Sequence, residues 1–298
     1  MLASAVKKWR NLEFLPQPTP QSLSEDYFIT TFSGSLFVII TKFTKEMLTM
    51  NLQDKLQQID ALKSQVSGLP EKSCQSFDDD FRLNFTYHSN AIEGNTLTLM
   101  ETKVVLEGIT IGGKSLREHF EVINHNEAIF FIEDIVKQNI PLTEQTIKSI
   151  HQLILKNIDD ENAGKYRTVN VLIAGAEHKP PQAFEVAAQM ERFMRWYQTD
   201  AQNLHPVIRA SRVHIDFVGI HPFIDGNGRT SRLLMNLELL KNQYPAVYIK
   251  SDRKVEYYTA LDTAHCTQNC DLFDNLLADY VLAELTRKVA LLNTPPET

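Results

Sequence analysis

Residues 206–241 read PVIRASRVHIDFVGIHPFIDGNGRTSRLLMNLELLK, with two apolar stretches on either side of a short polar bend. In both stretches the apolar residues recur at three- and four-residue steps, the spacing of one face of an α-helix. These positions are Val207, Val213 and Phe217 before the bend and Leu233, Leu234, Leu237 and Leu240 after it. The pattern predicts two helices, over 207–218 and 230–241, joined by a turn.

The turn contains the tripeptide Gly226-Asn227-Gly228 directly before the second helix. Glycine lets backbone N–H groups approach a ligand without obstruction by a Cβ atom. The first N–H groups of a helix also lack intrahelical acceptors, and the helix dipole favours an anion there. The turn is therefore expected to cradle a phosphate group.

Charged side chains around this turn suit the same chemistry. Arg229 and Arg232 are three residues apart, so they share a helix face and can grip neighbouring phosphates. Asp225 offers the hard oxygen ligand that Mg²⁺ prefers, and His221 can accept a proton near neutral pH. Together these groups indicate nucleotidyl or phosphoryl transfer. The calcium-binding EF-hand pattern fails, because its twelfth position would be Asn236 instead of glutamate.

Most of the remaining chain also has helical spacing. Thr98 followed by Glu101 forms a capping-box pattern at the start of one further helix. The other helical patterns cover residues 51–66, 77–90, 120–138, 144–156, 186–197, 257–264 and 272–289. The chain is therefore expected to be mainly α-helical.

One segment departs from the helical pattern. Val169, Val171 and Ile173 alternate with other residues, and a glycine and two prolines follow. Alternation that ends in turn residues predicts a short β-hairpin over 166–174. The predicted fold is mainly α with one small β-hairpin.

The composition narrows the function classes. The 298 residues carry 30 Lys and Arg against 37 Asp and Glu, a formal charge of −7. This acidic balance argues against a protein whose main task is to bind nucleic acid, because phosphate neutralisation needs a basic surface. The cysteines Cys74, Cys266 and Cys270 form no CxxC pair, which argues against a disulfide scaffold or a structural zinc site. We therefore expect a cytoplasmic protein.

Residues 1–50 differ from the rest and are expected to form an N-terminal extension, either an extra strand or a poorly ordered segment. The apolar run 36–40 is too short to cross a membrane, and the features of a signal peptide are missing. Met50 opens a helical pattern, so translation could begin there. The expected divisions that follow are an N-terminal helical region, 51–110, and a catalytic core, 111–298.

Residues 108–115, GITIGGKS, match the phosphate-loop pattern GxxxxGK[ST]. In a P-loop NTPase, Lys114 would supply the cation and Ser115 a Mg²⁺ ligand. Such a loop follows a buried strand, whereas residues 98–107 carry a helix cap and helical spacing. We therefore interpret Gly108–Ser115 as a turn between two helices and keep the P-loop NTPase as an alternative.

The segment 221–232 resembles the signature of the Fic family, HPFx[DE]GNGRxxR, without a departure. Members of this family are helical proteins that mostly transfer AMP from ATP to a hydroxyl side chain of a target protein. The resemblance implies a Fic-type helical bundle in which His221 is the base that activates the hydroxyl and Asp225 holds Mg²⁺ on the ATP phosphates. It assigns the phosphates themselves to Gly226, Asn227, Gly228, Arg229 and Arg232.

Ser89, Glu93 and Gly94 resemble the family's autoinhibitory motif, [ST]xxxE[GN]. The implied role of Glu93 is to pair with Arg232 and to take the place that the γ-phosphate needs. ATP could still bind, but with its α-phosphate misaligned for attack, and a misplacement of about 1 Å can lower the rate about a hundredfold. The same glutamate could instead position a water molecule for the removal of AMP.

The predicted hairpin with Val169, Val171 and Ile173 resembles the family's flap, which pairs with the target segment that bears the hydroxyl. An exposed strand edge suits such a peptide. Because backbone pairing is nearly blind to side chains, the flap does not identify the target.

Two tyrosines and a histidine bear on the nucleoside. Tyr257 and Tyr258 fall where family members enclose the adenine, and one of them suits a core position equally well. His265 stands where close relatives carry an asparagine near the ribose, so the nucleoside contacts stay open.

The sequence leaves four functions open. They are an AMP transferase inhibited by Glu93, a hydrolase that removes AMP with the same site, a P-loop NTPase that uses Lys114, and a binding module without chemistry. The intact motif argues against the last. The expected partners are ATP with Mg²⁺ and an unknown target protein, with no nucleic acid and no membrane, and analogy with relatives suggests a homodimer.

Overall fold

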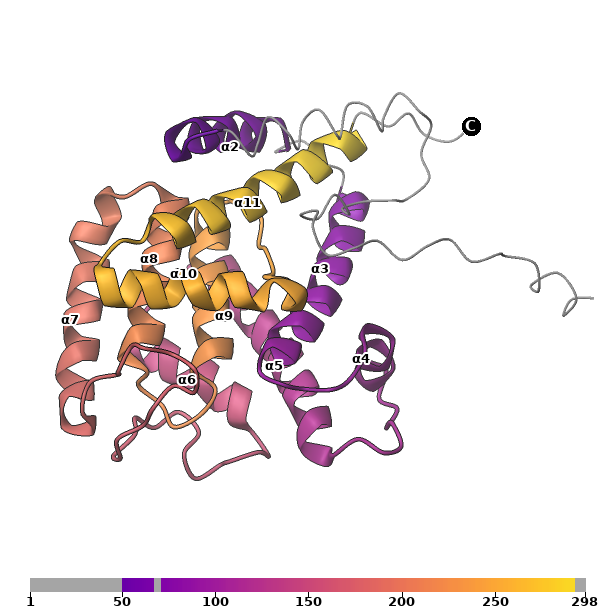
Figure 1. Ribbon diagram of the computed structural model, residues 1–298. Helices are drawn as coiled ribbons and strands as arrows, with labels where there is room; N and C mark the ends of the chain where they lie inside the picture. The colour runs from indigo at the N-terminus through magenta and orange to yellow at the C-terminus, as the bar shows by residue number, and fades with distance from the viewer. Residues whose placement is uncertain (1–49, 67–70, 293–298) are drawn as a thin grey trace, which may run out of the picture. The chain divides into compact units, whose positions relative to one another are not determined.

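The computed structural model describes residues 50–66 and 71–292, which fold into helices joined by turns and irregular segments (Figure 1). The α-helices are α2 (Leu52–Val66), α3 (Glu71–Ile92), α4 (Leu99–Leu106), α5 (Leu116–Lys137), α6 (Glu144–Leu155), α7 (Val186–Gln198), α8 (Pro206–Ile220), α9 (Asn227–Lys241), α10 (Lys254–Thr267) and α11 (Asp271–Leu292). Short 3₁₀ helices are η2 (Ala183–Glu185), η3 (Asp200–Asn203) and η4 (Ser251–Arg253). The mainly α prediction is confirmed, while the expected extension over residues 1–50 lies almost entirely outside the described residues.

Several helices begin at side chains that satisfy their free N–H groups. The Thr98 hydroxyl accepts the N–H of Glu101, whose carboxylate accepts the N–H of Thr98, so the capping box at α4 is confirmed. Ser115 and Glu118 form a second capping box at α5. Thr143 caps α6 in the same way, by accepting an N–H group of its first turn.

The second of these caps decides the nature of the segment 108–115. The segment joins α4 to α5, and the Ser115 hydroxyl is the N-cap of α5 instead of a group that faces a ligand. The Lys114 ammonium donates to the backbone oxygen and the hydroxyl of Thr96, at 2.7 and 2.9 Å. The interpretation of Gly108–Ser115 as a turn between two helices is therefore confirmed.

Helices α8 and α9 pack against each other and against α5, α6 and α7. Phe217 on α8 and Phe223 in the bend after it are fully buried, as are Leu233 and Leu237 on α9. The bend is thus anchored in the core on both sides, which fixes the position of the polar groups between its apolar anchors.

Helix α2 lies alongside α11, although the two are far apart in sequence (Figure 1). The buried Lys55 on α2 forms an ion pair with Asp279 on α11 at 2.7 Å and donates to Asn275 at 3.2 Å. Ile59, on the same face of α2, is fully buried.

The predicted β-hairpin is wrong, because the described residues contain no β-strand in the segment 166–174. Groups of this segment bond to side chains and to the bend after α8 instead of a second strand. The Arg167 guanidinium donates to the oxygen of Val169, and the Asn170 side chain accepts the N–H of Ala183. The two prolines at 180–181 lack N–H groups and could not complete a ladder. We call residues 169–181 the flap segment.

No helix within 50–66 or 71–292 is both long enough and apolar enough to cross a membrane.

Asn236 on α9 gives a test of how the bend's second helix is held. Its side chain is fully buried, donates to the oxygen of Val247 at 2.9 Å and accepts the N–H of Val247 at 2.8 Å. Asn236→Ala leaves two buried backbone groups without partners, so we expect the free energy of unfolding to fall by about 2–4 kcal/mol. Urea denaturation measures it, with the exposed Asn203→Ala as the control, expected within about 0.5 kcal/mol of wild type. Equal stabilities would contradict this account of the packing.

Candidate active site

The bend between α8 and α9 is shaped by two left-handed backbone positions. His221 is the C-cap of α8 with φ 51°, and Gly226 is the N-cap of α9 with φ 78°. The left-handed conformation is costly for a residue with a side chain, so surrounding contacts must hold His221 in place. At Gly226 a Cβ atom would lie 3.3 Å from the ring of His151, which makes glycine the residue that fits.

Asn227 and His151 fix the bend from inside. The Asn227 side chain accepts the N–H of Phe223 at 2.9 Å and donates to its oxygen at 2.8 Å. The buried His151 ring on α6 donates to the oxygen of Asp225 at 2.9 Å and accepts the N–H of Gly164. It also stacks on Phe223, with ring centroids 3.6 Å apart. The side chain of Asn227 therefore shapes the bend, and the residue can serve a ligand through its backbone.

The His221 ring is oriented for base chemistry. A carbonyl can only accept, so the 3.3 Å contact between Nδ1 and the oxygen of Val218 places the proton of a neutral ring on Nδ1. Nε2 is then the nitrogen that can take up a proton. Burial lowers the pKa of His221 to about 4, with the positive charge of Arg167 acting in the same direction, so the ring is neutral at physiological pH.

Arg229 and Asp225 lie together at the start of α9. The Arg229 guanidinium is 2% exposed and contacts the Asp225 carboxylate at 3.2 Å. The other oxygen of Asp225 pairs with Arg117, which extends from the first turn of α5. Burial opposes ionisation of Asp225, but the charge of Arg229, the hydrogen bond from the Gly226 N–H and the charge of Arg117 together outweigh it and lower its pKa. Asp225 is therefore a charged carboxylate beside the bend.

Arg232 contacts the segment that the sequence predicts to be inhibitory. The Arg232 side chain, 1% exposed, donates to the hydroxyl of Ser89 at 3.0 Å and to its backbone oxygen at 2.9 Å. Its Nη2 also forms an ion pair with Glu93 at 2.7 Å. Burial alone would lower the pKa of Arg232, but the Tyr257 hydroxyl and the Glu93 carboxylate raise it, so the guanidinium stays charged. The structure thus brings together Ser89, Glu93 and Arg232, and Gly94 follows at the end of α3.

The Glu93 carboxylate reaches beyond Arg232 to the bend. Its Oε1 lies so close to Gly228 that a Cβ atom at this position would collide with it. Glu93 therefore lies against the first turn of α9 beside the Arg232 guanidinium, in a place where the helix N-terminus and the buried positive charge favour an anion.

The two tyrosines of α10 lie differently. Tyr257 is 1% exposed, and its hydroxyl contacts Arg232 at 3.3 Å and His214 at 2.9 Å. Tyr257 is therefore the one of the two tyrosines that occupies a core position, in contact with Arg232. Tyr258 is 46% exposed, and its hydroxyl donates to the oxygen of Ile92 at the end of α3. Only Tyr258 is open to a ligand.

A cavity of about 790 Å³ opens between α7, α8 and α10 beside the bend. Gly219, directly before the C-terminal residue of α8, and His265 on α10 line it. The His265 ring donates to the oxygen of Ile215, and a Cβ atom on Gly219 would lie 2.8 Å from its Nε2, so a larger residue at 219 would displace this ring. The lining does not include His221 or the cradle at 226–232.

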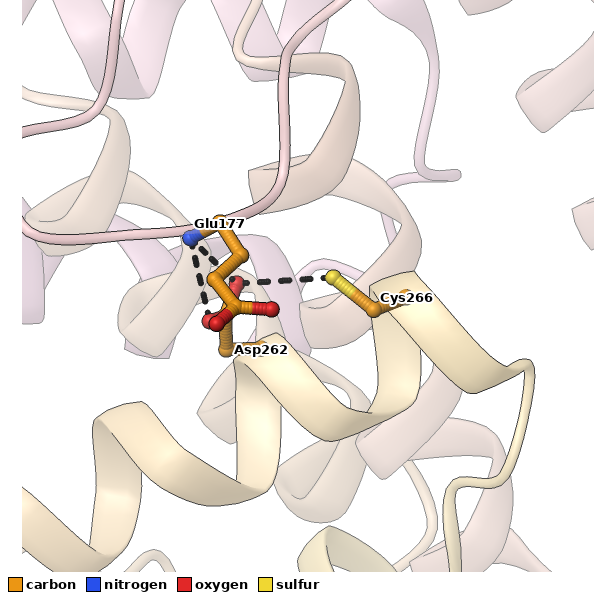
Figure 2. A group of neighbouring side chains, drawn as sticks. All are labelled: Glu177, Asp262 and Cys266. Atoms are coloured by element: carbon orange, nitrogen blue, oxygen red, sulfur yellow. Dashed lines mark hydrogen bonds between the residues drawn. The ribbon is translucent and has the colours of Figure 1, made fainter.

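The flap segment is tied to α10 by Asp262 (Figure 2). Its carboxylate accepts the N–H of Glu177 at 3.1 Å and that of His178 at 3.0 Å. The ligand atoms of Glu177, Asp262 and Cys266 all lie within 4.8 Å of one another, a grouping that could hold a metal ion. Because both Asp262 oxygens already accept backbone N–H groups, we assign the carboxylate to holding the flap segment.

Three residues of this site escaped the sequence prediction: Arg117, His151 and Arg167. Each acts from a distant part of the chain on the bend, and none belongs to a motif with recognisable spacing. A single histidine or arginine in a helix or loop is an ordinary sight in a sequence, so no local signal could have found them.

Comparisons with known proteins find a likeness over the helices that carry the bend. The Fic/DOC family profile matches residues 141–239. The chain is 36% identical over 226 residues to the protein adenylyltransferase Fic of Drosophila persimilis, an alignment that covers 74% of this chain and 44% of that protein. The identity to the protein of the same name from Drosophila grimshawi is 41% over 181 residues, or 60% of this chain and 37% of that protein. The chain thus spans less than half the length of these curated relatives.

Solved structures extend the likeness beyond the matched segment. Fic-1 of C. elegans, residues 134–508, superposes with a TM-score of 0.74 at 28% identity, covering 87% of this chain and 78% of that one. A Fic domain containing signaling protein of Bacteroides thetaiotaomicron superposes with a TM-score of 0.73 at 31% identity, covering 82% of this chain and 99% of that one.

The ring of His221 gives a prediction that needs no substrate. Because burial lowers its pKa to about 4, its NMR titration should have a midpoint near pH 4, far below the ordinary 6.5. His221→Ala identifies the resonance by its loss, and this assignment is needed because burial also lowers the pKa of His88 and His151 to about 4. A midpoint at 6.5 or above would contradict the buried environment that we describe.

Proposed function

This chain belongs to the Fic/DOC family, and from that premise we propose that it transfers AMP from ATP to a hydroxyl side chain of a target protein. The bend between α8 and α9 would hold the phosphates. The relatives named protein adenylyltransferase support this activity, although the chain spans only part of their length.

The observation that carries the proposal is the buried positive charge at the start of α9. Arg229 and Arg232 are both almost completely buried, and they lie in the first two turns of this helix, where N–H groups are free and the dipole favours an anion. Burying two guanidinium groups is costly unless anions accompany them. A triphosphate supplies such anions, and it fits the geometry of arginine forks.

The chemistry follows from the neutral His221 ring. The target O–H loses its proton to Nε2 of His221, and the oxygen forms a bond to the α-phosphorus of ATP. The bond between the α-phosphorus and the oxygen that leads to the β-phosphate breaks, and pyrophosphate leaves with the bonding electrons. The N–H groups of residues 227–229 and the Arg229 guanidinium face the charge that develops on the phosphates.

Asp225 is the residue that would hold Mg²⁺. It is an ionised carboxylate, partly exposed, at the edge of the phosphate cradle, and Mg²⁺ is commonly held by one or two carboxylates together with substrate phosphates. When bound, the ion neutralises charge on the phosphate oxygens. Arg117 must then give up its ion pair with Asp225, which is feasible for a side chain that is 56% exposed.

In this proposal, Glu93 inhibits the AMP transfer. Its carboxylate pairs with Arg232 and lies against Gly228, so the end of the triphosphate would have to displace it. A nucleotide that binds beside it would have its α-phosphate out of line with His221, and small displacements of this kind strongly slow a reaction.

The same contact favours a second candidate, a hydrolase that removes AMP from a modified side chain. A carboxylate beside the cradle could orient a water molecule toward the phosphorus. AMP release from a modified target, compared between wild type and Glu93→Gln, separates the two directions. Loss of release in the variant favours the hydrolase.

The homodimer, the cytoplasmic location and the absence of nucleic-acid and membrane partners stay predictions from the sequence, as do the divisions at residues 50 and 110. The pairing of the flap segment with a target polypeptide belongs to the proposal as well.

Substitution of Glu93 tests the proposed function and its inhibition together. Glu93→Gly frees Arg232 for a phosphate, so labelling of lysate proteins from ATP that carries the label at its α-phosphate should rise at least about tenfold over wild type. His221→Ala in the same background removes the base and should abolish labelling.

Glu107→Gly is the matched control, because Glu107 is an exposed glutamate at the end of α4 that touches no residue of the site. It should label as wild type does. Undiminished labelling by the His221→Ala protein would show that this residue is not the base.

Asp225 gives a separate test of the metal. Asp225→Asn in the Glu93→Gly background keeps the shape and removes the charge, so the Mg²⁺ concentration for half-maximal labelling should rise about tenfold or more. Asp216→Asn, in α8 away from the cradle, should leave it unchanged. The same half-maximal concentration in both variants would remove Asp225 from the metal site.

A further inference from the structure

Arg167 is a buried arginine that bonds to backbone oxygens alone. It is 3% exposed, and its guanidinium donates to the oxygens of His221 at 2.8 Å, Val169 at 3.0 Å and Pro181 at 2.6 Å. Its own backbone N–H donates to the oxygen of Pro222 at 2.9 Å. Both its main chain and its side chain thus bind the start of the bend.

Other buried arginines in the described chain have carboxylate partners. Arg209 pairs with Glu238, Arg229 with Asp225, and Arg232 with Glu93. Within residues 50–66 and 71–292 no ion pair is formed by Arg167. Burial lowers the pKa of Arg167, which marks the cost of placing this charge there. The guanidinium presents five N–H donors in a rigid planar fork, so one side chain can donate to three carbonyl oxygens at once.

The three carbonyl acceptors belong to the ends of the flap segment and to the bend. Val169 and Pro181 are the two ends of the flap segment, and His221 is the residue whose ring is placed to accept a proton. One rigid, planar group therefore fixes the two ends of the flap segment relative to each other and to the backbone of His221. It also binds the carbonyl of a residue in the left-handed conformation, which needs such support.

The rest of the flap segment is held independently. Asp262 binds the N–H groups of Glu177 and His178, and the His178 ring donates to the oxygen of Gly219. Val169 and Leu172, at 53% and 81% exposure, remain open to a partner. The base of the segment is thus tied to the bend, while its outer residues face outward.

We propose that Arg167 is a positioning residue that sets the register between the flap segment, on which a target polypeptide docks, and the ring of His221. This inference rests on the proposed function. The flap segment delivers the hydroxyl, and the cradle at the start of α9 delivers the α-phosphate. The Arg167 guanidinium connects the flap segment to His221 and donates no hydrogen bond to the cradle.

The role predicts a split between two measurements. Loss of the fork displaces the target hydroxyl from His221, and a shift of about 1 Å lowers the rate about a hundredfold. The cradle is left as it was, so the affinity for ATP should not change. A merely structural arginine would change both together or neither.

The test uses Arg167→Lys and Arg167→Gln in the full chain with Glu93→Gly. Isothermal titration with ATP measures affinity, and transfer of α-phosphate label to lysate proteins measures the reaction. We expect the affinity to stay within about threefold, and labelling to fall at least about thirtyfold in the glutamine variant, with lysine between it and the parent.

Arg209→Lys is the matched control, because Arg209 is an equally buried fork at the other end of α8 that pairs with Glu238. It should lower the melting temperature with labelling within about threefold of the parent. Parallel losses of ATP affinity and labelling in the Arg167 variants, or labelling equal to the parent, would overturn the positioning role. Failure of both variants to melt cooperatively would assign Arg167 to folding instead. A parent without labelling refutes the proposed function itself.

Discussion

The site depends on the burial of two arginines at the first turns of one helix. Arg229 and Arg232 add their charge to the free N–H groups and the dipole at the start of α9, in a place that water scarcely reaches. Positive charge so placed requires an anion, and the chain provides Asp225 for one guanidinium and Glu93 for the other. The proposed inhibitory contact and the proposed phosphate site therefore depend on the same electrostatic constraint.

This constraint also explains how the surrounding helices are arranged. Helix α3 ends where Ser89 and Glu93 reach Arg232, and Tyr258 of α10 binds the last residue of α3. The hydroxyl of Tyr257, from the same turn of α10, accepts a hydrogen bond from the Arg232 guanidinium. A nucleotide that replaced Glu93 would thus weaken one of the contacts that hold the end of α3, which connects occupancy of the site to the position of this helix.

Much of this arrangement could be predicted from the sequence, since periodic apolar residues, capping boxes and glycines act locally. The pairing of Glu93 with Arg232 followed from a motif resemblance, and the structure places these two side chains in contact. The hairpin prediction failed because alternation specifies only an extended segment, and it does not reveal that the Val169 oxygen bonds to the Arg167 guanidinium instead of a second strand. His151 was missed because contacts between distant residues leave no mark in local spacing.

The most direct test of the account is a crystal structure of the Glu93→Gly protein with Mg²⁺ and an ATP analogue that cannot be cleaved. The account predicts phosphate oxygens within about 3.2 Å of the Arg232 guanidinium and of the N–H groups at residues 227–229, with the α-phosphate facing the ring of His221. A triphosphate bound elsewhere, for example in the cavity between α7 and α10, with the cradle left without a phosphate, would contradict it.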